Sequence, residues 1–95
     1  MTCKNLAEVR QHIDALDDQL IQLLAQRQQY VLQAATFKTT TTDVKDDARV
    51  EAVIAKVRQK AEHYGADPTI VEKLYREMIA GFIQMELTAF EKNSH

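Results

Sequence analysis

The stretch "LLAQRQQYVLQAATFK", residues 23–38, decides the fold of this 95-residue chain, together with the residues that lead into it. Before Arg27, apolar residues recur at steps of three and four, at Val9, Ile13, Leu16, Leu20 and Leu23. This spacing is typical of one face of a buried α-helix. The next step of four reaches Arg27, the stripe resumes at Tyr30 and Ala34, and one further step reaches Lys38. Two cations therefore lie on a stripe that is otherwise apolar.

The composition indicates one small domain, residues 1–95, without the bulk properties of a nucleic-acid or membrane protein. There are 12 basic and 14 acidic residues, so no charge excess favours nucleic acid or an anionic membrane surface. No apolar run approaches the ~20 residues of a membrane span, and the N-terminus lacks the hydrophobic centre of a signal peptide. The single cysteine, Cys3, excludes an internal disulfide and a cysteine-built metal site. We expect a cytoplasmic protein.

The scarcity of helix breakers predicts an all-α fold. The chain has two glycines and one proline, and none of them precedes Gly65. The apolar periodicity predicts three helices, at about residues 5–38, 47–63 and 68–91. The break at residues 39–45, "TTTTDVK", is expected because β-branched threonines are poor helix formers. The expected capping residues are Asn5 with Glu8, Gly65, Asp67 and Pro68.

The length of the first helix indicates a homodimer. About 33 residues at 1.5 Å per residue give a helix of about 50 Å, which is longer than a 95-residue globule is wide. Its apolar stripe nevertheless continues along most of its length, so a second surface is needed to cover it. The buried side of the second helix is expected at Val50, Val53, Val57 and Ala61. We expect two chains intertwined through their long first helices.

The charged residues on the apolar faces are the candidates for a binding site. Arg27 and Lys38 are eleven residues apart, so on a continuous helix they point the same way at a separation of about 16 Å. One interpretation is that both snorkel, with apolar stems on the core and charged heads in water. A second is a structural ion pair between Arg27 and Glu86, which lies on the apolar side of the third helix. A third is a cavity that holds an anionic ligand.

Two further arginines favour the ligand site. Arg10 is seventeen residues before Arg27 and leaves the helix about 100° away, so in a dimer it reaches the site of the other chain. Arg49 begins the second helix, from which its side chain can swing over such a site. Guanidinium groups bind carboxylates bidentately, so the set favours a small ligand with more than one carboxylate.

No nucleophile, cofactor motif or metal site is visible in the sequence. There is no glycine-rich phosphate loop, and the histidines show no metal-ligand spacing and are expected on the surface: His12, His63 and His95. An enzyme built from these residues would need no cofactor and no metal, and would act by positioning and electrostatics.

The segments "LAEVRQHIDALDDQLIQLLAQRQQYV…FK", "DDARVEAVI" and "GADPTIVEKLYREMI…E" resemble the all-helical class of chorismate mutases. The resemblance covers residues 6 to about 90. It is carried by an arginine before the pattern I-D-x-L-D, a second arginine seventeen residues on, a lysine eleven further, and an arginine at the start of the second helix. It implies a three-helix chain entwined as a homodimer, with two active sites that each draw on both chains.

The resemblance also implies roles for individual residues. Arg10 from the partner chain and Arg27 would each bind one carboxylate of the substrate, and Lys38 would donate a hydrogen bond to the ether oxygen. Glu86 stands where many relatives have a glutamine that donates to the same oxygen. As a carboxylate it could not donate, so activity is expected to decline as pH rises. The remaining residues implied in substrate binding are Asp46, Arg49 and Phe82.

Two positions depart from the mutase pattern and leave the substrate open. Many mutases have a glutamate where this chain has Val50, and many have a serine where it has Phe82. The Arg49–Val50 pair resembles the isochorismate pyruvate-lyase branch, which forms salicylate and pyruvate. Chorismate mutase is favoured, the lyase is the alternative, and both activities in one pocket are a further option. A non-catalytic helical dimerisation module would explain the apolar stripes without explaining Arg27.

Overall fold

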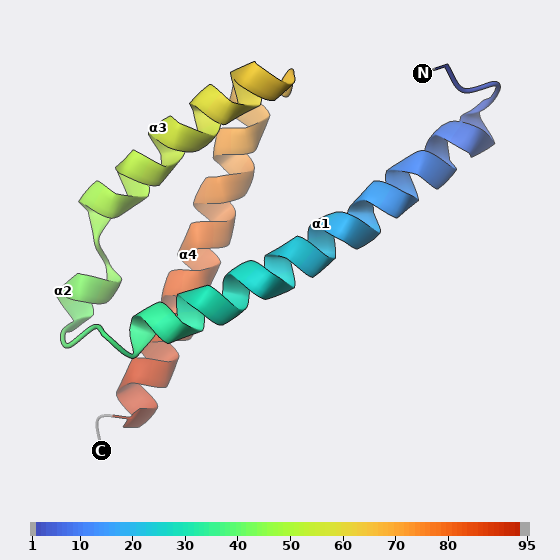
Figure 1. Ribbon diagram of the computed structural model, residues 1–95. Helices are drawn as coiled ribbons and strands as arrows, with labels where there is room; N and C mark the ends of the chain where they lie inside the picture. Colours follow the sequence, from blue (N-terminus) through green and yellow to red (C-terminus); the bar gives the residue numbers. More distant parts are fainter. Residues whose placement is uncertain (1, 94–95) are drawn as a thin grey trace. The chain divides into compact units, whose positions relative to one another are not determined.

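The computed structural model describes residues 2–93 and is built from α-helices. Within that range there is no β-strand, as the scarcity of glycine and proline predicts. Figure 1 shows the elements, which are α1 Leu6–Ala35, α2 Thr41–Val44, α3 Asp47–Tyr64 and α4 Pro68–Asn93. The three long helices match the expected ones, and α2 is an additional single turn in the segment expected to be a break.

The chain divides into two compact units, Met1–Val31 and Leu32–His95. The first unit consists mainly of α1 as far as Val31, and no residue of α1 is buried. The apolar stripe is exposed along this helix, with 62% of Leu16, 54% of Leu20 and 59% of Leu23 accessible to solvent. An apolar face this long is normally covered, so α1 carries a surface suited to another protein surface.

The start of α1 is capped as the sequence predicts. The backbone N–H of Glu8 donates to Oδ1 of Asn5 at 2.9 Å, which satisfies one of the free donors of the first turn. The reciprocal bond differs from an ideal capping box, because Glu8 Oε2 accepts from the backbone N–H of Lys4 at 3.3 Å. The segment before the helix is thereby held against its first turn.

In the second unit, α3 and α4 form an antiparallel hairpin, and α2 packs against α4 (Figure 1). The turn between α3 and α4 contains the capping residues that the sequence predicts. Gly65 has a φ of 80°, the left-handed conformation that glycine adopts without a steric penalty, and its N–H caps the end of α3. Asp67 Oδ1 accepts from the backbone N–H of Thr69 at 2.8 Å, and Pro68 is the first residue of α4.

The apolar core of this unit is centred on three buried side chains, Val44, Ile54 and Ala61. Ala61 was expected to be buried, whereas Ile54 was not, although it lies four residues after Val50 and shares its face of the helix. The expected core residues Val50, Val53 and Val57 are half-buried.

Ion pairs join the outer sides of α3 and α4. The Arg76 guanidinium donates to both carboxylate oxygens of Glu51 across the hairpin, at 2.8 and 3.0 Å, and to Glu72 at 2.7 Å. Arg58 on α3 donates to the other oxygen of Glu72 at 2.7 Å. Two glutamates and two arginines thus alternate along one edge of the hairpin.

Among residues 2–93, no helix combines the length and the apolar character needed to cross a bilayer.

Candidate active site

A buried ion pair joins two residues that the sequence predicts for the same site. The ammonium of Lys38 donates to Oε2 of Glu86 at 2.7 Å, across 48 residues of sequence. Glu86 is 4% exposed, and it is the buried charged residue of the part of the chain that the structure describes. A charge this deeply buried requires a partner, and Lys38 supplies one. Glu86 therefore pairs with Lys38 rather than standing alone on the apolar side of α4.

The end of α1 differs from the expected helix, and the difference places Lys38. The helix ends at Ala35, three residues before the expected end at Lys38. The next residues tighten into i→i+3 hydrogen bonds, in which Phe37 N–H donates to Ala34 at 3.1 Å and Lys38 N–H to Ala35 at 3.2 Å. Lys38 thus lies beyond the regular helix, and the expectation of a continuous helix as far as Lys38 is wrong.

The segment after Lys38 is held by one carboxylate. Oδ2 of Asp43 accepts from the backbone N–H and the hydroxyl of Thr39, both at 3.1 Å, and from the N–H of Thr40 at 3.2 Å. The N–H of Asp43 donates back to the Thr40 hydroxyl at 3.1 Å. These bonds, led by the one from the Thr39 backbone, lower the pKa of Asp43 below its usual value of 3.8.

Helix propensity alone predicts a break at the four threonines, and the structure instead forms the single turn of α2 there. Thr40 and Asp43 have the spacing of a capping box, and this spacing was the available signal. Val44, at the end of α2, is buried and anchors the turn. The residue next to Lys38 is therefore fixed from two sides, by the Asp43 carboxylate and by the packing of Val44.

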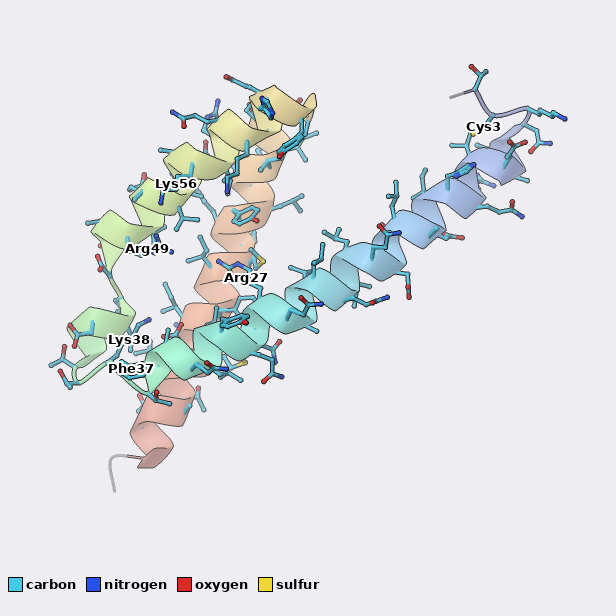
Figure 2. The ribbon with its side chains drawn as sticks, in the orientation of Figure 1. Cys3, Arg27, Phe37, Lys38, Arg49 and Lys56 are labelled. Carbon is cyan, nitrogen blue, oxygen red and sulfur yellow. The ribbon has the colours of Figure 1, made fainter. Side chains whose placement is uncertain are left out.

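Asp46 and Arg49 are joined through the backbone at the start of α3. Asp46 is the N-cap, and its Oδ1 accepts from the backbone N–H of Arg49 at 3.0 Å. Both side chains are exposed, and Arg49 projects from the first turn of α3 (Figure 2). Asp46 thus has a structural role in the helix, and the guanidinium of Arg49 is accessible to a ligand.

The other three predicted residues lie on the long helices. Phe82 is half-buried on α4, one turn before Glu86 and on the same face. Arg10 and Arg27 belong to the N-terminal unit, and Arg10 is exposed whereas Arg27 is half-buried. The burial of Arg27 contrasts with the exposed Leu20 and Leu23 before it on the stripe. Among the predicted site residues, the structure joins Lys38 to Glu86 and Asp46 to Arg49.

Comparison with known proteins finds similarity along most of the chain. Residues 9–87 match the sequence model of the family described as chorismate mutase type II. A Pseudomonas aeruginosa protein named isochorismate pyruvate lyase is 32% identical to this chain over 85 residues, which are 90% of this chain and 84% of that relative. The matched region contains every predicted site residue from Arg10 to Glu86.

Proposed function

We propose that this chain, which belongs to the chorismate mutase type II family, rearranges chorismate to prephenate. The chain is an enzyme of the chorismate mutase type, related to an isochorismate pyruvate lyase. The observation that carries the assignment of roles is the pair of Lys38 with the buried Glu86, whose charged atoms are 2.7 Å apart. We expect the reaction in the cytoplasm.

Lys38 and Glu86 are proposed to bind the ether oxygen of the substrate. In the rearrangement this C–O bond breaks ahead of C–C bond formation, so negative charge grows on the oxygen. The ammonium of Lys38 stabilises that charge more in the transition state than in the ground state. Glu86 can donate only when protonated, so the proposal requires that it take up a proton from water when the substrate replaces Lys38 as its partner.

The arginines are proposed to bind the two carboxylates of the substrate. Arg27 binds one carboxylate and Arg10 of the second chain binds the other, since guanidinium groups and carboxylates form parallel pairs of hydrogen bonds. Arg49, Asp46 and Phe82 complete the pocket. Fixing both carboxylates holds the enolpyruvyl arm in its compact reactive shape and lowers the entropic barrier. No covalent intermediate and no cofactor is involved in this mechanism.

The assembly that this mechanism requires is a homodimer in which the α1 helices pack together. Its support is the exposed stripe of α1, which includes Ile13 at 49% exposure as well as Leu16, Leu20 and Leu23. Burying such side chains contributes roughly 1.5–3 kcal/mol each. In this proposal residues 1–95 form one domain, and two copies of it make the dimer. We expect neither nucleic acid nor a membrane as a partner.

The experiment is to incubate the purified chain with chorismate and to follow its loss together with the appearance of prephenate. We expect turnover well above the uncatalysed rate, and a Lys38→Ala variant should lose nearly all of it. Lys60→Ala is the matched control, because Lys60 is an exposed lysine on α3. Turnover equal to the uncatalysed rate for the wild-type chain would contradict the proposal.

Isochorismate pyruvate-lyase activity is the second candidate, and Val50 together with the 32% identical relative favours it. In that reaction the same C–O bond breaks while a ring hydrogen moves to the enolpyruvyl methylene carbon, giving salicylate and pyruvate. The same donors at the ether oxygen serve both reactions. Parallel assays with isochorismate, read by salicylate fluorescence, separate the two. A kcat/KM for isochorismate above that for chorismate would make the lyase the main activity.

A further inference from the structure

Three potential metal ligands meet at the start of α1, apart from the residues discussed above. Cys3, Glu8 and His12 each offer one ligand atom, and these atoms lie within 4.8 Å of one another. All three residues belong to the N-terminal unit. Cys3 and Glu8 are half-buried, and His12 is exposed. The sequence predicts no metal site here, since it has a single cysteine and no histidine spacing typical of ligands; the structure departs from that expectation because Cys3 meets Glu8 and His12 from outside the helix.

The local fold explains why these side chains meet. Glu8 and His12 are four residues apart on α1, so they lie one above the other on the same face. Cys3 precedes the helix, and the bond from the Lys4 N–H to Glu8 Oε2 draws this segment against the first turn. Figure 2 shows Cys3 beside the beginning of α1. A carboxylate has two oxygens, so Glu8 can keep the bond from Lys4 and still bind a metal.

The geometry points to a zinc site formed by Cys3 Sγ, a carboxylate oxygen of Glu8 and a ring nitrogen of His12, with the fourth position open to water. Thiolate, imidazole and carboxylate are the ligands that Zn²⁺ takes in proteins, and three protein ligands with one open position is a common arrangement. A thiolate and an imidazole disfavour Mg²⁺ and Ca²⁺, which bind oxygen ligands. The thiolate and the carboxylate together balance the two positive charges of the ion.

The spacing of the ligand atoms fits after a small closure. Zinc–ligand distances of about 2.0–2.3 Å place neighbouring ligand atoms of a tetrahedron about 3.3–3.8 Å apart. The ligand atoms lie within 4.8 Å of one another, so the largest of these separations is up to about 1 Å greater than in a zinc-bound tetrahedron. His12 is exposed and can change rotamer, so the closure needs no movement of the helix. Bound zinc would then fasten residue 3 to the first two turns of α1.

The zinc site is independent of the proposed substrate contacts. Arg10 lies two residues from both Glu8 and His12, so its side chain leaves the helix about 160° away from theirs. Variants of Cys3, Glu8 or His12 therefore remove no residue assigned to the substrate. Zinc binding and chorismate turnover can also be measured separately, so failure of one does not imply failure of the other.

The test uses the full-length, untagged chain, reduced and treated with a chelator, and titrated with Zn²⁺ by calorimetry. Co²⁺ is the spectroscopic probe, because a cobalt–thiolate bond gives an intense near-ultraviolet band. We expect one ion per chain, a cobalt–thiolate band, and a higher melting temperature with zinc. Cys3→Ser should abolish the band, and His12→Asn and Glu8→Gln should each weaken binding at least about tenfold.

His63→Asn is the matched control, since His63 is a helical histidine on α3 whose ring contacts Tyr64. It should leave zinc affinity unchanged. Circular dichroism of each variant checks that α1 is still helical. Absence of the cobalt–thiolate band in the wild-type chain would overturn the proposal. So would zinc affinity that is equal in wild type, Cys3→Ser and His12→Asn, because that result means an adventitious ion only.

Discussion

The N-terminal part of α1 and the two helices of the α3–α4 hairpin are amphipathic, yet only the hairpin contains buried apolar side chains, although Ile70 and Leu74 of α4 are also exposed. In the hairpin, Ile54 and Ala61 are buried and ion pairs join the two helices at their edge. On α1, no residue is buried and Leu16 is 62% exposed. The hairpin therefore contains stabilising contacts of its own, whereas the apolar stripe of α1 is exposed, and the proposed homodimer would cover it.

The largest expected effect comes from placing a charge on the exposed stripe of α1. Leu20→Glu should convert the proposed dimer to monomers and reduce chorismate turnover to the uncatalysed rate, because an unpaired carboxylate is costly to bury in the interface. Light scattering and activity assays measure both. Gln29→Glu is the control, because residue 29 lies on the opposite side of the helix and is exposed. Leu20→Glu with unchanged molecular mass and turnover would show that the stripe is not the interface.

The second-largest effect is expected from removing Lys38, which pairs with Glu86 in the C-terminal unit. Lys38→Ala should lower kcat about 10²–10³-fold, the usual result of removing one donor to a developing oxyanion. The helices of the hairpin should still form, but the melting temperature should fall because the buried Glu86 loses its partner. Arg27→Ala should also lose most activity while α1 remains helical. Steady-state kinetics and circular dichroism check these outcomes. Near wild-type turnover in both variants would exclude the assigned roles, and loss of helicity in Arg27→Ala would indicate a structural role instead.

The third effect is a pH dependence that comes from Glu86. A carboxylate accepts from Lys38 in the free chain but cannot donate to the ether oxygen, so turnover should fall as pH rises. Glu86→Gln keeps a donor that cannot ionise and should flatten this decline. The measurement is kcat/KM from about pH 5 to 9. A wild-type profile that rises with pH would show that Glu86 is not the donor.

A smaller effect is expected at the turn that follows Lys38. Asp43→Asn should lower the thermal midpoint slightly and lower kcat a few-fold, because the charged acceptor of three hydrogen bonds is lost. The folded chain holds the pKa of Asp43 below 3.8, so its stabilising contribution is complete above that pH and disappears as pH falls through the lowered pKa. Thermal melts of both proteins should therefore differ above about pH 4 and converge in acid. A difference that persists at low pH would contradict this account.

The smallest effect is expected at the edge of the hairpin. Arg76→Gln removes the bonds to Glu51 and Glu72, which are exposed or half-buried, so the midpoint should fall by a few degrees at most. Arg76 lowers the pKa of both glutamates, so this contribution is present above their usual value of 4.5 and is lost in acid. Melts at low and high salt measure it. A large loss at high salt would show that Arg76 acts through packing.

The sequence predicts best what depends on neighbouring residues. The cap at Asn5, the left-handed turn at Gly65 and the start of α4 at Pro68 follow from local chemistry, and the structure confirms them. The turn of α2 depends on a side-chain bond between Thr40 and Asp43 that outweighs the poor helix propensity of threonine.

Contacts between distant segments were harder to predict. Both Lys38 and Glu86 were assigned to one site through the family resemblance, but their direct bond depends on how α4 packs beside the turn after α1. Ile54 fits the three-four repeat as well as Val53 does, being four residues after Val50 and three before Val57, so spacing alone does not decide which of the two is buried. The meeting of Cys3 with His12 required the path of the chain before the helix, which no periodicity describes.

The ion pair between Lys38 and Glu86 bears on which ligands the proposed site can accept. An oxygen that accepts from both groups needs them about 4.6 Å apart, from two hydrogen bonds of about 2.8 Å at a tetrahedral angle. In the ion pair, Lys38 Nζ and Glu86 Oε2 are 2.7 Å apart. A ligand must therefore separate the two groups by about 2 Å and replace their mutual attraction with its own. In the proposed site, a simple anion could pair with Lys38 but would leave Glu86 buried without a partner, so we expect the pair to select against simple anions.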